Sequence, residues 1–143
     1  MKTARITKIS IIVTVVLAAL LCFVGCNQVE KTGVWENATY LSDKEFGNGA
    51  TTVQLQVKAE DKSVTFTVHT DKKILGDALV EHKLIEGEQG AFGIYIKKVN
   101  GILADFDVDG TYWALYKDGE MLMTGADSTA ISDGEHYEFV RTK

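Results

Sequence analysis

Apolar and polar residues alternate strictly in two neighbouring stretches of this chain. In residues 52–58 every second residue is valine or leucine, and the residues between them are threonine, glutamine or lysine. Residues 63–69 repeat the alternation with valine and phenylalanine. A period of two is typical of a strand with one buried face. Since only the short polar segment AEDKS separates the two stretches, they predict a β-hairpin.

The period changes in the segment DKKILGDALVEHKLIEG that follows. The three- and four-residue spacing of a helix is seen at Leu75, Ala78, Leu79 and His82. Asp71 is the predicted N-cap, because its side chain can accept hydrogen bonds from the first turn. Gly87 is the predicted end of the helical segment.

Four short β-rich runs come next: FGIYIKKV, TYWALYK, GEMLMTG and HYEFVRT. The KDG and SDG sequences between them have the composition of tight turns. A hairpin, one helix and three to four further short strands predict an α+β fold, a single small β-grasp-like domain in which a curved mixed sheet wraps around the helix. A small β-sandwich with the helix as a plug is the alternative.

The N-terminus has the features of an export signal. A basic start is followed by an uncharged apolar run at residues 9–24, which is shorter than the roughly 20 residues that a spanning helix needs. The run ends in FVGC, and a small residue before a cysteine is typical of bacterial lipoproteins, in which Cys26 would be lipidated after cleavage. An ordinary signal peptide or an uncleaved anchor is the alternative. The predicted organisation is a lipoprotein signal peptide at 1–25, the lipidated cysteine with a tether and lead-in at 26–50, and the domain at 51–143.

The net charge of the cleaved chain bears on which kind of molecule the protein binds. Cleavage before Cys26 would remove three of the 15 basic residues and leave 12 against 20 Asp and Glu, a net charge of about −8. Such a charge disfavours nucleic acid as a partner.

The segment ADFDVDG begins like a calcium-binding loop, with Asp105, Asp107 and Asp109 followed by Gly110. Position 12 of such a loop requires a bidentate glutamate, but Tyr116 stands there, and β-rich runs replace the flanking helices. The favoured interpretation is a tight turn in which Gly110 has positive φ. The sequence therefore predicts no metal site, with the three aspartates as weak alternative candidates for a calcium turn.

Side chains suited to catalysis are scattered. His69, His82 and His136 have no spacing typical of metal ligands, and Asp77 and Glu81 are best explained as a solvated helix face. The sequence contains neither a G-x-S-x-G motif nor a phosphate-binding glycine loop. We therefore predict that the protein is not an enzyme.

Aromatic residues crowd into the second half of the chain. Strand alternation places Tyr112, Ala114 and Tyr116 on one face and Trp113 and Leu115 on the other. One set is expected to pack on the helix and the other to face solvent, the lead-in or a ligand. Alternatively, both sets are core, with the aromatic residues of the lead-in covering the second face.

The stretches FGIYIKKVNGILADFDVDGTYWALYKDGE and GADSTAISDGEHYEFV resemble the transcobalamin-like C-terminal domain family. The resemblance covers residues 35–143, and this family is similar to the β-domain of animal vitamin B12 carriers. It implies a β-grasp-like fold related to soluble ligand-binding domains. Carried onto this sequence, it places the ligand-side candidates at Gly93 and Tyr95 in FGIYI and at Trp113 and Leu115 in YWALY.

Together these features predict an extracytoplasmic lipoprotein, anchored to the bacterial cell membrane by a lipid on Cys26. It would capture a small molecule, cobalamin or a related corrinoid first, for delivery to a vitamin-uptake transporter, and it would need no cofactor. The alternative is a surface module that interacts with a protein or glycan and binds no small molecule.

Labelled palmitate should enter the wild-type protein but not Cys26→Ser, because the acylated thiol is removed. Cys22→Ser is the control and should label like the wild type, since Cys22 would be discarded with the signal peptide. Equal labelling of wild type and Cys26→Ser in a fluorography assay would contradict the lipoprotein interpretation and favour a transmembrane anchor.

Overall fold

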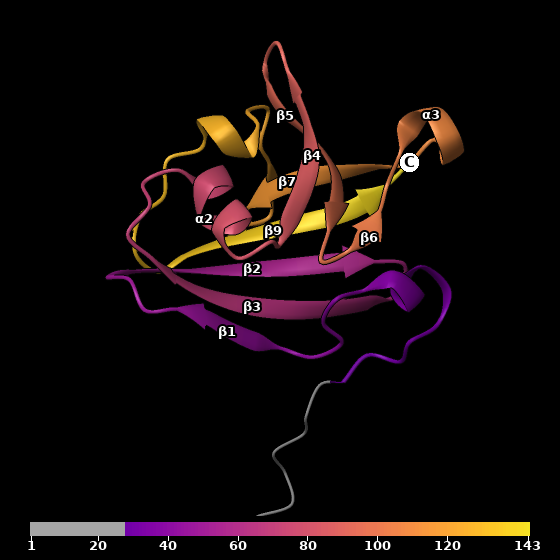
Figure 1. Cartoon of the computed structure of the whole chain (residues 1–143), viewed down its shortest axis with the longest axis horizontal. Coiled ribbons are helices and arrows are strands. Elements are labelled where there is room, and N and C mark those ends of the chain that lie inside the picture. The colour runs from indigo at the N-terminus through magenta and orange to yellow at the C-terminus, as the bar shows by residue number, and fades with distance from the viewer. Residues whose placement is uncertain (1–27) are drawn as a thin grey trace, which may run out of the picture.

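A mixed six-stranded sheet forms the centre of the protein. In the computed structural model, which describes residues 28–143, the strands lie in the order β1 (Lys44–Gly47), β3 (Lys62–Thr70), β2 (Thr51–Ala59), β9 (Glu135–Thr142), β7 (Tyr112–Lys117) and β8 (Glu120–Met121) (Figure 1). The predicted signal peptide, Cys22 and Cys26 lie outside the described residues.

A second, three-stranded antiparallel sheet stands beside the first. It consists of β4 (Ile85–Gly90), β5 (Gly93–Val99) and β6 (Ile102–Leu103). The helical elements of residues 28–143 are all short: α2 (Leu75–Glu81), α3 (Phe106–Asp109) and the 3-10 turns η1 (Gly33–Asn37) and η2 (Ala126–Ser128). The chain is therefore a mixed α and β protein made mostly of strands. Within residues 28–143, none of the helices has the length and apolar character needed to cross a membrane.

The predicted hairpin is confirmed, and it supplies the middle of the sheet. β2 and β3 pair antiparallel from Thr51 opposite Thr70 to Ala59 opposite Lys62. On its other side β2 pairs in parallel with β9, the last strand, placing Leu55 opposite Tyr137. The first long strand and the last one are thus neighbours at the centre of the sheet.

The core lies between one face of this sheet and α2. The alternate residues Val53, Leu55 and Val57 are fully buried, as their period of two predicts. Leu75 and Leu79 of α2 are fully buried as well, which confirms the helical periodicity. The opposite face of the sheet is more polar and lies in contact with solvent along much of β2 and β3.

The predicted limits of the helix are wrong at both ends. α2 starts after Ile74, whose backbone is extended (φ −118°, ψ 137°) because it forms a bridge with Ala130. Asp71 therefore lies before the helix, and its Oδ1 accepts the N–H of Ala50 (3.0 Å). Gly87 lies within β4, which is exposed at every position after Ile85 and so lacks the alternation that marks a half-buried strand. Within residues 28–143 six strands follow α2, where three to four were predicted.

The lead-in is part of the folded unit from residue 28 onward. Trp35 of η1 is fully buried, and its Nε1 donates to the carbonyl of Ala59 (3.0 Å). Tyr40, Phe46 and Phe66 pack edge to face, with ring centroids 5.2–5.8 Å apart. β1 extends the sheet by pairing in parallel with β3. Because Phe66 belongs to the core, these aromatic residues pack on the same side of the sheet as α2 and do not cover the second face.

Trp35→Phe should destabilise the protein more than Trp113→Phe, although both changes remove the same atoms. The first leaves the buried carbonyl of Ala59 without its donor, which costs about 1–3 kcal/mol. The indole nitrogen of Trp113 has no hydrogen-bond partner to lose in the described part of the chain. Urea unfolding of the two variants measures the difference. Equal losses would contradict the stabilising role of the Trp35 bond.

Candidate functional site

β7 has a strand partner along its whole length on one side only. It pairs with β9 from Tyr112 to Lys117, but with β8 only at Tyr116 and Lys117. β5 runs past the remaining part of β7 without pairing with it, because it belongs to the second sheet. A groove of about 330 Å³ opens between the two strands.

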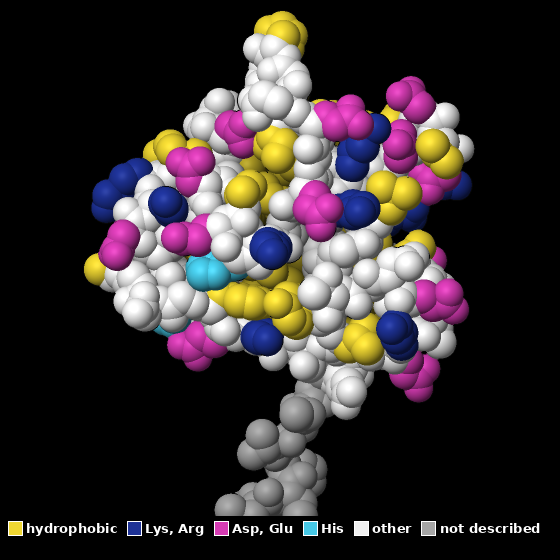
Figure 2. Space-filling model, in the orientation of Figure 1, with side chains coloured by type: hydrophobic (Ala, Val, Ile, Leu, Met, Phe, Trp, Pro, Cys, Tyr) yellow, Lys and Arg dark blue, Asp and Glu magenta, His cyan; other side chains and the backbone are white. Residues whose placement is uncertain are grey.

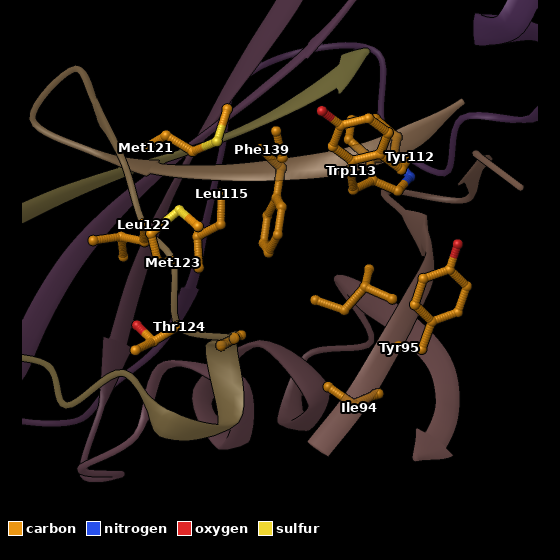
Figure 3. Close-up of a pocket in the computed structure, with 14 residues that line it drawn as sticks. Ile94, Tyr95, Tyr112, Trp113, Leu115, Met121, Leu122, Met123, Thr124 and Phe139 are labelled. Atoms are coloured by element: carbon orange, nitrogen blue, oxygen red, sulfur yellow. The ribbon is translucent and has the colours of Figure 1, made fainter. Parts of the chain in front are cut away.

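The walls of this groove come from four parts of the chain (Figure 3). They are Ile94, Tyr95 and Ile96 of β5; Tyr112, Trp113, Ala114 and Leu115 of β7; Met121, Leu122, Met123, Thr124, Gly125 and Ala126, which lead from β8 into η2; and Phe139 of β9.

The chemistry of the groove is apolar and uncharged. Among its lining residues there is no Asp, Glu, Lys, Arg or His. Trp113 and Leu115 lie on the core-facing side of β7, with Leu115 opposite the buried Phe139. Tyr95 and Tyr112 at the rim are 46% and 36% exposed. Aromatic and aliphatic walls of this kind suit a neutral molecule with a flat apolar face.

Two hydrogen bonds near the C-terminal end of β7 fix which peptide groups of this strand point into the groove. The N–H of Asp118 donates to the carbonyl of His136 on β9 (3.3 Å), and the carbonyl of Leu115 accepts from the N–H of Leu122 on the opposite side (2.8 Å). Peptide groups alternate in direction along a strand. The N–H and C=O of Trp113 therefore point away from β9, toward the groove.

The indole of Trp113 adds a second polar group. Trp113 is 8% exposed, and its Nε1 is buried with no hydrogen-bond partner within residues 28–143. A buried donor without an acceptor costs roughly 1–3 kcal/mol, so its presence in a folded protein requires an explanation. An acceptor on a bound molecule would remove this cost.

Three of the four ligand-side candidates line the groove, namely Tyr95, Trp113 and Leu115. Gly93 lies at the start of β5, just outside the lining. The wall at residues 121–126 was missed by sequence reasoning. The feature that could have indicated this wall is the apolar run MLM at residues 121–123, which follows a hairpin turn and which we expected to form a longer strand.

The aspartate-rich segment forms a single helical turn away from these walls. Asp105 caps α3 by accepting the N–H of Asp107 (3.1 Å) and pairs with Lys97 (3.3 Å). Gly110 ends the turn with φ of 73°, as predicted. Asp109 instead pairs with Arg141 (2.6 Å), so the carboxylates of Asp105 and Asp109 have different partners.

The charge of Asp109 is held by protein groups. Hydrogen bonds from the hydroxyl and backbone of Thr111, with the charge of Arg141, hold the pKa of Asp109 below its usual range. Across the described part of the chain, no three His, Cys, Asp or Glu side chains gather closely enough to hold a metal ion.

A strand-rich domain with an open apolar groove is the class that the fold and site define. Residues 73–140 match the model of a family described as a domain of unknown function (DUF4430). The crystal structure of a candidate metal binding protein from Ruminococcus gnavus ATCC 29149 is 32% identical with a TM-score of 0.62, and the match covers 65% of this chain and 97% of that one. This chain therefore belongs to the same family as the Ruminococcus gnavus protein.

Haptocorrin in complex with Cbi is also similar, at 25% identity and a TM-score of 0.53. The match covers 68% of this chain but 26% of haptocorrin, so the chain corresponds to about a quarter of that protein. Among curated proteins, none matches the sequence significantly.

Calcium should leave the melting temperature unchanged, because Asp105 and Asp109 are committed to different partners. If a calcium site existed, calcium at 100 times the dissociation constant would raise the free energy of unfolding by roughly 2.7 kcal/mol. That increase would raise the melting temperature of a domain of this size by several degrees or more. Differential scanning fluorimetry with calcium and with chelator measures the shift. A calcium-dependent rise that Asp107→Asn abolishes would show that the segment is a metal site.

Proposed function

We propose that this protein binds a neutral small molecule in the groove between β5 and β7, and that a corrinoid such as cobalamin or cobinamide is the first candidate. The observation that carries the proposal is the groove itself: uncharged walls around a buried tryptophan whose indole N–H has no acceptor among residues 28–143. A flat, amphipathic molecule that carries amide oxygens fits these walls and this donor.

The comparison with haptocorrin supports the corrinoid version. That protein was solved with Cbi bound, and the similarity extends over 68% of this chain. The strand order supports a β-grasp assignment for the fold, since the hairpin β2–β3 precedes the helix and β9 returns to pair in parallel with β2. We do not extend metal binding from the Ruminococcus gnavus relative, because residues 28–143 bring no three suitable side chains together.

The open shape of the groove sets the expected strength of binding. At about 330 Å³ it lies at the lower end of the range of small-molecule sites and encloses only part of a large ligand. A corrinoid would keep one face in solvent. We therefore expect a dissociation constant in the micromolar to millimolar range, about −8 to −4 kcal/mol.

Tethering is the second part of the proposal. The sequence around Cys26 supports a lipid anchor that holds the domain on the outer side of the bacterial cell membrane. Gln28, the first described residue, forms a bridge with Ser42 near β1, which is one edge of the large sheet, whereas β7 and β8 lie at the other edge. An anchor on this side would leave the groove accessible from outside, where a vitamin-uptake transporter is the proposed recipient. We propose a binding protein, not an enzyme.

Exposed apolar residues outside the groove favour a second candidate, a surface module that binds a protein or glycan. The tip of the β4–β5 hairpin carries a hydrophobic side chain in the space-filling view (Figure 2), and Phe92, in its turn, is 100% exposed. Phe106 and Val108 of α3 are also exposed. Exposed apolar surface of this kind marks interaction sites.

Calorimetry of the full chain in detergent against cobinamide, cobalamin and haem tests the small-molecule proposal. Cobinamide should bind, and Tyr95→Ala should weaken binding by roughly threefold to tenfold through lost aromatic contact of about 0.5–1.5 kcal/mol. Phe92→Ala is the matched control on the same hairpin, because Phe92 does not line the groove. No heat from any of the three at millimolar concentration would contradict the proposal. An equal loss in both variants would place the binding site on the outer hairpin and contradict binding in the groove.

A further inference from the structure

η2 joins the two walls of the groove at one end. In the close-up, this turn lies below the cavity, between the wall that carries Thr124 and the strand that carries Ile94 (Figure 3). Gly125 and Ala126 contribute to the lining, and Asp127 follows in η2 but is outside it. The distance between the two walls therefore depends on the contacts that η2 makes with each of them.

Asp127 contacts the β5 wall directly. Its Oδ2 accepts the N–H of Ile94 at 2.8 Å. A Cβ added to Gly93, which has φ of 107°, would lie 3.2 Å from the same oxygen, and one added to Gly76 of α2 would lie 2.7 Å from Oδ1. Glycine at both positions leaves room for the carboxylate between β5 and the first turn of α2.

Within residues 28–143, the outer half of the β4–β5 hairpin makes few other polar contacts with the rest of the protein. At its base Ile85 pairs with Val99, and both residues are buried. β4 is exposed from Glu86 to Gly90, and the hairpin stands out from the rest of the protein (Figure 1). Lys97 reaches Asp105 from the base half (3.3 Å). Ile94, which forms the outer part of the wall, is held through Asp127.

We propose that Asp127 is a positioning residue that sets the width of the groove by holding the outer half of the hairpin against η2. This inference rests on the proposed function, because its consequence is ligand affinity. Without the carboxylate, the hairpin swings away from β7 more often. A ligand then loses contact with one wall, although Asp127 does not touch it.

The first readout needs no ligand. In the full chain, Asp127→Ala should speed amide hydrogen exchange at Ile94 at least tenfold, because its acceptor is lost, while exchange in β2 and β3 stays unchanged. Asp127→Asn keeps an oxygen that can accept this N–H and should restore most of the protection. Asp133→Ala is the matched control, since Asp133 accepts the N–H of Thr52 (2.7 Å) and neither residue lines the groove. If Asp127→Ala does not fold, Asp127→Ser, too short to reach Ile94, replaces it.

The second readout is affinity. Calorimetric titration with cobinamide should give a dissociation constant several-fold higher for Asp127→Ala, near wild type for Asp127→Asn and unchanged for Asp133→Ala. Unchanged exchange at Ile94, or faster exchange with unchanged affinity, would overturn the role of Asp127. If the wild type does not bind cobinamide, the proposed function fails, and the exchange rates of the ligand-free protein decide whether Asp127 holds the hairpin.

Discussion

The groove exists because β7 is paired along its full length on one side only. Its pairing with β8 covers two residues, and β5, the strand beside the rest of it, belongs to another sheet. The peptide groups of Trp113 therefore face a gap in place of a seventh strand. Trp113 and Leu115 share the core-facing side of β7, so the apolar floor of the gap continues the hydrophobic core. An unmatched strand edge and an open apolar surface are features that proteins normally avoid.

The parts of the fold with a strong sequence period were predictable. The β2–β3 hairpin and α2 each present a regular apolar series to one core. β1 and β4 were not predictable, because β1 is four residues long and β4 is almost entirely exposed, so neither needs an apolar pattern. The cap expected at Asp71 failed for a tertiary reason. The bridge between Ile74 and Ala130 keeps the chain extended beyond the position where local preference would start the helix.

The candidate site was predictable on the two walls that β5 and β7 form, but not at residues 121–126. The aromatic alternation of β7 and the resemblance to transcobalamin-like domains pointed to Trp113, Leu115 and Tyr95. The wall at residues 121–126 was not recognisable, because its shape depends on where η2 holds the chain after β8. The unsatisfied indole N–H of Trp113 is likewise a property of packing. Sequence inspection cannot distinguish it from the satisfied N–H of Trp35.

The two tryptophans allow the central claim to be tested in one spectrum. Each indole N–H gives its own signal in a ¹H–¹⁵N correlation experiment, and the two are assigned with Trp35→Phe and Trp113→Phe. On titration with cobinamide, the Trp113 signal should move progressively as its donor finds an acceptor. The Trp35 signal, whose N–H is bonded to Ala59, should stay in place. A Trp113 signal that remains fixed while other resonances shift would contradict ligand binding in the groove.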